Sequence, residues 1–206
     1  MNRVGIIDYG MGNLTSVRNA VAALGQSVVI LNDPAEMAQV THLILPGVGA
    51  FGDGMANLRR AGWIPRMEEM IFERSVPFLG ICLGLQLLAT HGSEHGDFAG
   101  LNWIEGDVIR FPDHAEAPRV PHIGWNDVEP VHRDASYRQG FERPGVFYFV
   151  HSYHFVPRDP SVVDGWCDYG IRFAASVRLR NIWAVQYHPE KSQKPGLQVL
   201  RNFLTG

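Results

Sequence analysis

The sequence is poor in cysteine and has no excess of positive charge, and each shortage excludes a class of protein. Cys82 and Cys167 are the only cysteines among 206 residues, too few for a disulfide framework. Lysine and arginine number 18 against 21 acidic residues, so nothing favours binding to nucleic acid or to an anionic membrane. No apolar run is long enough to cross a bilayer, and residues 4–7 are too few for a signal-peptide core. We therefore expect a cytoplasmic protein with no nucleic acid and no membrane among its partners.

What the sequence does have is an alternation of strand and helix patterns in its first half. This alternation continues to about Gly100 and predicts an α/β fold, with a mostly parallel central sheet and helices on both faces. The expected strands cover residues 4–7, 27–31, 41–45 and 76–81. The expected helices cover residues 14–24, 57–73 with a break at 62–65, and 83–89.

Beyond Gly100 the strand patterns follow one another with little helix between them. We expect strands at 103–110, 123–131, 146–150, 173–179 and 182–187, a polar loop at 113–121 and a last helix at 196–204. No linker, repeat or low-complexity tract divides the chain, and 46% of its residues are hydrophobic, enough for one full core. These segments are therefore expected to add antiparallel strands to a single flavodoxin-like domain that spans residues 1–206.

A cysteine flanked by glycines is the most informative feature of the sequence. Gly80, Cys82 and Gly84 form a G-x-C-x-G pattern between an expected strand and an expected helix, the cysteine form of the turn that presents a nucleophile above a sheet. The N-terminus of that helix would favour the thiolate, and the N–H of Leu83 would be an oxyanion donor. The alternative, a small buried hydrophobic residue, is our interpretation of Cys167.

His188 is the best placed of nine histidines to act as the base for this thiol. It follows an apolar strand, and the carboxyl ends of parallel strands meet at one edge of a sheet. Pro189 favours extended backbone at His188, in which residues two apart point the same way, so Glu190 can orient the ring. A surface histidine beside a loop proline is the alternative. His151 and His154 could line the same site.

Two other glycine-containing stretches have less specific patterns. Gly47 and Gly49 follow a strand, so their turn lies at the same edge as Cys82 and could direct a peptide N–H into the site, although an ordinary glycine-rich turn fits equally well. Trp125, beside Gly124, could be a core residue or could face a partner. The sequence contains no C-x-x-C or H-E-x-x-H pattern, so we expect no metal site.

In combination these stretches resemble the class I glutamine amidotransferase family. The elbow at 80–86 and the triplet at 188–190 are specific to that broad class, and the resemblance runs from the first strand to the last helix. It narrows to the glutaminase subunits of imidazole glycerol phosphate synthases at residues 8–14, 46–51, 121–126, 148–153 and 185–192.

The resemblance implies a role for each site residue. Cys82 attacks the side-chain amide of L-glutamine, and His188, oriented by Glu190, protonates the departing ammonia and then activates water against the thioester. The implied oxyanion donors are the N–H of Leu83 and an N–H from the turn at Val48 and Gly49. The implied contacts to the glutamine head are Gln86, Glu94 and the backbone of Ser152 and Tyr153.

The resemblance also implies a protein partner and no cofactor. Ammonia passes to a (β/α)8 barrel cyclase subunit in a heterodimer, and that subunit makes imidazole glycerol phosphate and an aminoimidazole carboxamide ribotide in histidine biosynthesis. Trp125, Asn126 and Lys191 match positions at the subunit interface. Members of the family are poor glutaminases alone, and the turn at 46–49 is part of the switch that partner and acceptor binding operate.

Three other functions stay open at the level of sequence. Related subunits supply ammonia for sugar amidination in surface polysaccharides. A stand-alone cysteine hydrolase would need no partner, but α/β-hydrolase triads place their acid well before the histidine rather than two residues after it. A binding module that has kept only the fold is the third, and the intact set of Cys82, His188 and Glu190 argues against it.

Overall fold

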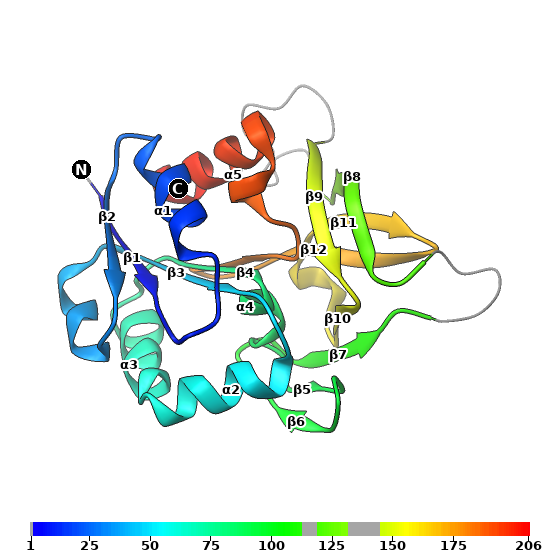
Figure 1. The fold of residues 1–206 in the computed structure, drawn as a ribbon, viewed down its shortest axis with the longest axis horizontal. Helices are drawn as coiled ribbons and strands as arrows, with labels where there is room; N and C mark the ends of the chain where they lie inside the picture. The colour runs from blue at the N-terminus through cyan, green and yellow to red at the C-terminus, as the bar shows by residue number, and fades with distance from the viewer. Residues whose placement is uncertain (1, 113–118, 132–144) are drawn as a thin grey trace.

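The computed structural model describes residues 2–112, 119–131 and 145–206 (Figure 1), and most of the loop expected at 113–121 lies outside them. The strands are β1 (Arg3–Ile7), β2 (Ser27–Leu31), β3 (His42–Gly47), β4 (Phe78–Cys82), β5 (His91–Gly92), β6 (Phe98–Ala99), β7 (Gly106–Arg110), β8 (His122–Pro130), β9 (Gly145–His151), β10 (Tyr153–Pro157), β11 (Val163–Tyr169), β12 (Ile171–Leu179) and β13 (Ile182–Val185). The α-helices are α1 (Leu14–Ala22), α2 (Phe51–Arg60), α3 (Trp63–Glu68), α4 (Leu83–Gln86) and α5 (Gln193–Thr205). Single turns of 3-10 helix lie at Pro160–Val162 and Pro189–Lys191, a longer 3-10 segment at Pro34–Gln39, and a π-helical turn at Glu69–Glu73.

Two sheets organise the described residues. Nine of the described strands form the main sheet in the order β2-β1-β3-β4-β13-β12-β11-β8-β9, and another four form a smaller sheet in the order β10-β7-β5-β6. Neighbours in the main sheet are parallel from β2 to β13 and antiparallel from β13 to β9. The α/β fold with added antiparallel strands is therefore confirmed, and β4 and β13 lie side by side where the parallel half ends.

Helices cover both faces of the parallel half, as the alternating pattern predicts (Figure 1). Helices α1 and α5 pack on one face, where Val21 and Phe203 belong to one buried cluster. Helices α2, α3 and α4 pack on the other face, where Phe51 and Trp63 are fully buried. Each side chain of this size stabilises the fold by about 2 kcal/mol through burial. None of the helices in the described part of the chain is long and apolar enough to span a membrane.

The second half contains more strand than its sequence pattern indicates. Strands β5, β6, β10 and β11 were not predicted, and the segment expected as a strand at 103–110 begins at Gly106 and joins the smaller sheet. In β11, Asp164 and Gly165 interrupt the alternation of apolar and polar residues, and the register with β12 shifts at Gly165. Strands β5 and β6 have two residues each, too few for any period to appear.

The helices differ from expectation at two ends that matter for the site. Helix α2 begins at Phe51, before the expected residue 57. Its first turn contains glycines, which have low helix propensity, but their positions leave little room for a side chain. A Cβ at Gly52 would lie 2.8 Å from the ring of Phe98, and one at Gly54 would lie 3.2 Å from Leu87. Helix α4 ends at Gln86, so the helix expected over 83–89 is wrong in its last three residues.

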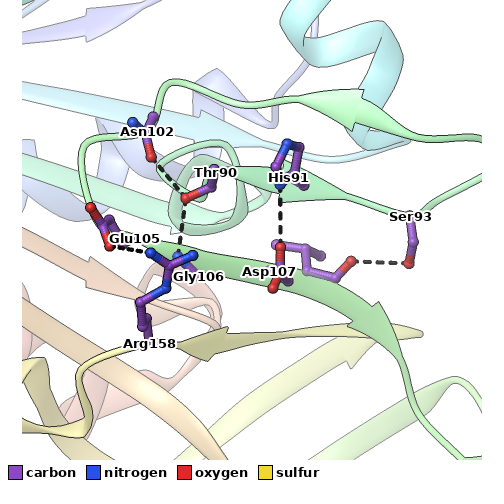
Figure 2. A network of polar contacts seen from close by, with 9 residues as sticks. Thr90, His91, Ser93, Asn102, Glu105, Gly106, Asp107 and Arg158 are labelled. Carbon is purple, nitrogen blue, oxygen red and sulfur yellow. Dashed lines mark hydrogen bonds and ion pairs between the residues drawn. The ribbon is translucent and has the colours of Figure 1, made fainter.

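Polar contacts join the strands of the smaller sheet to one another and to the loops beside them (Figure 2). Thr90 Oγ1 donates to Asn102 Oδ1 at 2.7 Å and accepts from the N–H of Gly106 at 3.2 Å. Exposed polar pairs join His91 to Asp107 and Arg158 to Glu105. These contacts matter for the site because the loop between β5 and β6 carries Glu94.

The turn between β4 and α4 brings backbone segments into contact at distances that glycine alone permits. A Cβ on Gly80 would lie 2.7 Å from the carbonyl oxygen of Gly84, and one on Gly84 would collide with the carbonyl oxygen of Leu45 in β3. Between them Cys82 has φ 55° and ψ −107°, a conformation that L-residues rarely adopt. The tight turn that the G-x-C-x-G pattern predicts is present.

Gly84→Ala tests this packing. Alanine is favoured over glycine by about 1 kcal/mol inside a helix, so with open space around it the substitution would stabilise α4. We instead expect a loss of about 1–3 kcal/mol in the free energy of unfolding, because the methyl group meets the fixed backbone of Leu45. Urea denaturation measures the change. Gly12→Ala, whose Cβ makes ordinary contacts at 3.4 Å, is the control, and equal stability of the two variants would contradict the packing argument.

Candidate active site

The thiol of Cys82 lies at the carboxyl end of β4, on the wall of a cavity of about 500 Å³. The side chain is 7% exposed, so it is largely enclosed but can be reached from the cavity. The other lining residues come from five separate segments and are Val48, Gly49, Ala50, Leu83, Gln86, Glu94, His95, Pro121, Val150, His151, Ser152 and Tyr153. The structure thus gathers around Cys82 every residue that the sequence assigns to the oxyanion hole and to glutamine binding.

His188 and Glu190 lie side by side just after β13, which is parallel to β4. Pro189 follows an extended His188, at φ −100° and ψ 95°, and the two side chains then meet with Nδ1 of His188 2.8 Å from Oε1 of Glu190. Both side chains are 2% exposed. Burial alone would lower the pKa of His188, but its interactions with Cys82 and Glu190 raise it to about 10. Glu190 occupies Nδ1, which leaves Nε2 for the thiol, and the raised pKa favours a protonated ring.

Gln186 also belongs to the site, although it was not among the site residues expected from the sequence. Its Nε2 donates to Sγ of Cys82 at 3.6 Å, and its Oε1 accepts from Nε2 of Gln86 at 3.1 Å. A signal was available, because Gln186 stands two residues before His188 at the end of a strand, where alternate side chains share a side. Its contact with the thiol nevertheless depends on a partner that lies 100 residues away in the chain.

The glycine-rich turn after β3 lies next to the elbow. Gly47 is in register with Cys82 across the β3–β4 pair, so the turn starts level with the nucleophile. Gly49 has φ 112°, which allows a peptide orientation that a residue with a side chain would resist. Val48, Gly49 and Leu83 all line the cavity beside the thiol. This is the position that oxyanion donors require.

Gln86 and Glu94 are both bonded within the protein already. Nε2 of Gln86 donates to Gln186 and, at 3.0 Å, to the carbonyl of Tyr153, so its two amide hydrogens are engaged and only its Oε1 is left to accept from a ligand. Oε2 of Glu94 accepts from the N–H of Phe51 at 2.9 Å and so holds the first residue of α2. A ligand would therefore meet acceptors, rather than donors, on these two side chains.

Buried histidines form a directional chain of hydrogen bonds behind the cavity. His151 Nδ1 lies 2.8 Å from the carbonyl of Tyr153, and because a carbonyl only accepts, this nitrogen carries the hydrogen. His151 Nε2 then accepts from Nδ1 of His122 at 3.1 Å, and His122 Nε2 accepts from Asn126 at 3.4 Å. Burial lowers the pKa of His151 to about 3 and of His122 to about 4, so both rings are neutral near pH 7. His154, also buried, packs against other rings instead of lining the cavity.

The residues expected at an interface lie on β8 and just after β13. Trp125 is 49% exposed, and its ring lies 5.8 Å from that of Tyr148 between centroids. Nζ of Lys191 lies 5.7 Å from the same tyrosine ring, so the half-buried tyrosine connects two exposed side chains. Asn126 differs, because its amide donates to the carbonyl of Asp168 at 2.9 Å and to His122.

The second cysteine has the setting of a core residue. Cys167 is free, 1% exposed, and burial raises its pKa to about 12, so it stays a thiol near neutral pH. Among residues 2–112, 119–131 and 145–206, no group of three or more histidine, cysteine, aspartate or glutamate side chains is arranged to hold a metal ion. Of the two cysteines, Cys82 is the one that lines the cavity.

Comparison with known proteins agrees with this arrangement. The family model described as glutamine amidotransferase class-I matches residues 5–206. The chain therefore belongs to the class-I glutamine amidotransferase family.

Curated relatives show which group within this family the chain resembles in sequence. The chain is 49% identical over 203 residues to imidazole glycerol phosphate synthase subunit HisH of Moorella thermoacetica, with 98% of this chain and 94% of the relative covered. It is 48% identical to the subunit of the same name from Syntrophotalea carbinolica, with 96% and 97% covered, and 46% identical to that of Aquifex aeolicus, with 98% and 95% covered. Within its class the chain belongs with the family of these HisH subunits.

Solved structures share the fold at much lower identity. A crystal structure described as glutamine amidotransferase superposes with a TM-score of 0.75 at 22% identity, covering 98% of this chain and 96% of the other. PurLQS from Thermotoga maritima superposes with a TM-score of 0.76 at 19% identity, covering 99% and 98%. The architecture of this chain is thus that of the class.

The neutral histidines predict a loss of stability in acid. Unfolded histidine takes up a proton below its ordinary pKa of 6.5, whereas His151 in the native state does so only near 3. Stability from this group is therefore present above pH 6.5 and falls by up to about 1.4 kcal/mol per pH unit below it. His151→Asn keeps a donor for Tyr153 but cannot titrate, so we expect a shallower decline between pH 6.5 and 4, measured by urea unfolding at each pH. Phe111→Leu, which loosens the same cluster without changing proton uptake, should keep the wild-type slope, and an unchanged slope in His151→Asn would contradict the neutral ring.

Proposed function

We propose that this chain is the glutaminase subunit of an imidazole glycerol phosphate synthase and that it hydrolyses L-glutamine through a thioester on Cys82. The observation that carries the proposal is that His188, paired with Glu190, interacts with Cys82 on the wall of the cavity, in a chain of the class-I glutamine amidotransferase family. Identity to HisH subunits over nearly the whole chain favours histidine biosynthesis over sugar amidination as the pathway.

The first half of the reaction releases ammonia. The proton of the Cys82 thiol passes to Nε2 of His188, and the sulfur attacks the carboxamide carbon of glutamine. Negative charge then develops on the amide oxygen, and the N–H of Leu83 and an N–H of the Val48–Gly49 turn stabilise it. As the carbon–nitrogen bond breaks, His188 returns its proton to the nitrogen, which leaves as ammonia, and the glutamyl group remains on sulfur as a thioester.

The second half of the reaction regenerates the thiol. His188 removes a proton from water, whose oxygen attacks the thioester carbon at the same oxyanion donors. Breakdown of this intermediate expels the sulfur, which recovers its proton from His188, and glutamate is released. Glu190 accepts from Nδ1 throughout, which keeps Nε2 as the nitrogen that exchanges protons with the reacting groups.

Recognition of glutamine follows from the acceptors around the cavity. The α-ammonium group of the substrate is a cationic donor, and Oε1 of Gln86 and the carboxylate of Glu94 are suited to accept from it. The backbone of Ser152 and Tyr153 borders the same space. In this arrangement the substrate side chain extends toward Cys82.

The exposed face of β8 and β9 is the proposed contact with the synthase partner. Trp125, Ile123 and Val146 are 49%, 59% and 41% exposed, and Tyr148 lies between Trp125 and Lys191, in contact with both. A group of large exposed apolar side chains on paired strands suits a protein interface. We assign this face to a (β/α)8 barrel cyclase subunit in a cytoplasmic heterodimer, which uses the ammonia to make imidazole glycerol phosphate and an aminoimidazole carboxamide ribotide.

Glutamate formation from glutamine tests the proposal. We expect slow turnover by the purified chain alone and a large rise when a cyclase subunit and its nucleotide ligand are added. Cys82→Ala should lower the stimulated rate at least about a thousandfold, because the covalent step is lost. Cys167→Ala is the matched control and should retain the rate. Equal turnover with and without the partner would favour an independent hydrolase instead.

Glu190→Gln tests the orientation of the base. The amide is the same size but lacks the charge that helps to raise the pKa of His188, so protonated His188 becomes less stable and the ring is held less firmly. We expect the stimulated glutaminase rate to fall about a hundredfold or more. Glu129→Gln, on an exposed carboxylate paired with Arg172, is the control. Activity within twofold of wild type in Glu190→Gln would rule out this role for the carboxylate.

A further inference from the structure

Gln186 directly follows β13, at the edge of the sheet where Cys82 and the cavity lie. Its side chain is fully buried, and its backbone N–H donates to the carbonyl of Ala175 in the neighbouring strand at 2.8 Å. Gln186 and His188 are two residues apart, and both side chains reach Cys82. Tyr187 between them points to the other side, where its ring stacks on Phe147 at a centroid distance of 4.0 Å.

The orientation of the Gln186 amide follows from its neighbours. The Tyr153 carbonyl accepts from Gln86, so the group of Gln86 that faces it is the nitrogen, and the same nitrogen faces Gln186. Gln186 must therefore present its oxygen to Gln86 and its nitrogen to Sγ of Cys82, 3.6 Å away. If the oxygen and nitrogen of the Gln186 amide were exchanged, its NH₂ group would face the NH₂ group of Gln86, and neither could accept a hydrogen bond. The chain from Tyr153 to Cys82 thus has one consistent direction.

A buried N–H directed at sulfur has a specific chemical consequence. It stabilises a thiolate more than a thiol, since a hydrogen bond to a charged acceptor is stronger than one to a neutral acceptor. The amide is uncharged and does not titrate, so it does this without competing with His188 for the proton. It also restricts the position of Sγ relative to the cavity.

We infer that Gln186 is a fourth catalytic residue, whose side-chain amide, fixed by Gln86, donates to the sulfur of Cys82 and stabilises the thiolate. The inference rests on the proposed thioester chemistry for its importance in turnover. Its effect on the thiol itself is independent of the substrate and can be measured without glutamine or a partner. The alternative is a purely structural role, in which the hydrogen bonds of Gln186 serve only to pair its buried amide.

Alkylation of Cys82 by iodoacetamide, measured as a function of pH, separates these two roles. Cys167 is buried and remains a thiol, so Cys82 is the group that reacts. Gln186→Met has nearly the same length and volume but no donor, and we expect its alkylation rate near pH 7 to fall about tenfold and the midpoint of its pH profile to rise by about one unit. Gln186→Glu keeps an acceptor for Gln86 but sets a carboxylate against the sulfur, so its rate should fall further.

Ser176→Ala is the matched control for these variants. Ser176 is 2% exposed on the neighbouring strand β12 and pairs with Val185, but it does not belong to the chain that reaches the sulfur. Its rate and its pH profile should match wild type. Alkylation by Gln186→Met within twofold of wild type, with the same midpoint, would overturn the inference. Glutamate formation is assayed separately, so a chain that lacks glutaminase activity but shows these alkylation shifts would refute the proposed function and not the role of Gln186.

A measurement on the unsubstituted chain covers the case in which the variants do not fold. When the glutamine residues of the protein are labelled with 15N, the NMR signal of the Gln186 side-chain NH₂ group should shift as Cys82 titrates. It should shift again when Cys82 is alkylated. Gln198, whose amide donates to Asn202 on α5, provides an internal reference that should not move. A Gln186 signal that is insensitive to both changes would contradict the hydrogen bond to sulfur.

Discussion

The contact of α4 with the ends of β3 and β4 is the constraint on which the active site depends. Gly80 and Gly84 let backbone meet backbone there, and the strand can then turn into the helix within a single residue, Cys82. This places the thiol level with Gly47 and the start of the neighbouring turn. The positions of the nucleophile and of the proposed oxyanion donors are therefore consequences of one close packing arrangement.

The remainder of the site depends on where the parallel half of the sheet ends. Strand β13 is parallel to β4 but antiparallel to β12, so it joins the two halves and brings Gln186 and His188 to the elbow. The antiparallel strands contribute the other wall, where neutral His151 and His122 continue the polar chain away from the cavity. The sulfur of Cys82 thus lies beside His188, whose raised pKa suits it to take up the thiol proton, whereas the histidines farther back are kept uncharged by burial.

Short-range patterns account for what the sequence could predict. The glycines around Cys82 and the spacing of His188 and Glu190 act over one or two residues, so sterics and strand geometry determine the result locally. Family resemblance supplied the roles of Gln86 and Glu94. Gln186 was missed because its role depends on contacts across the fold. Strands β5, β6 and β11 were missed because two-residue strands and a register shift leave no period to detect.

At position 82 the requirements of the fold and of the chemistry are in conflict, because the backbone angles favour glycine whereas the reaction needs a thiol. A side chain held at φ 55° and ψ −107° costs the native state about 1–3 kcal/mol, whereas glycine adopts such angles freely. The residue that would best suit the turn is thus one with no sulfur. A lineage released from the need for the reaction would drift toward glycine here and gain thermal tolerance as it lost its nucleophile, so cysteine persists at this turn only under continuous selection for turnover.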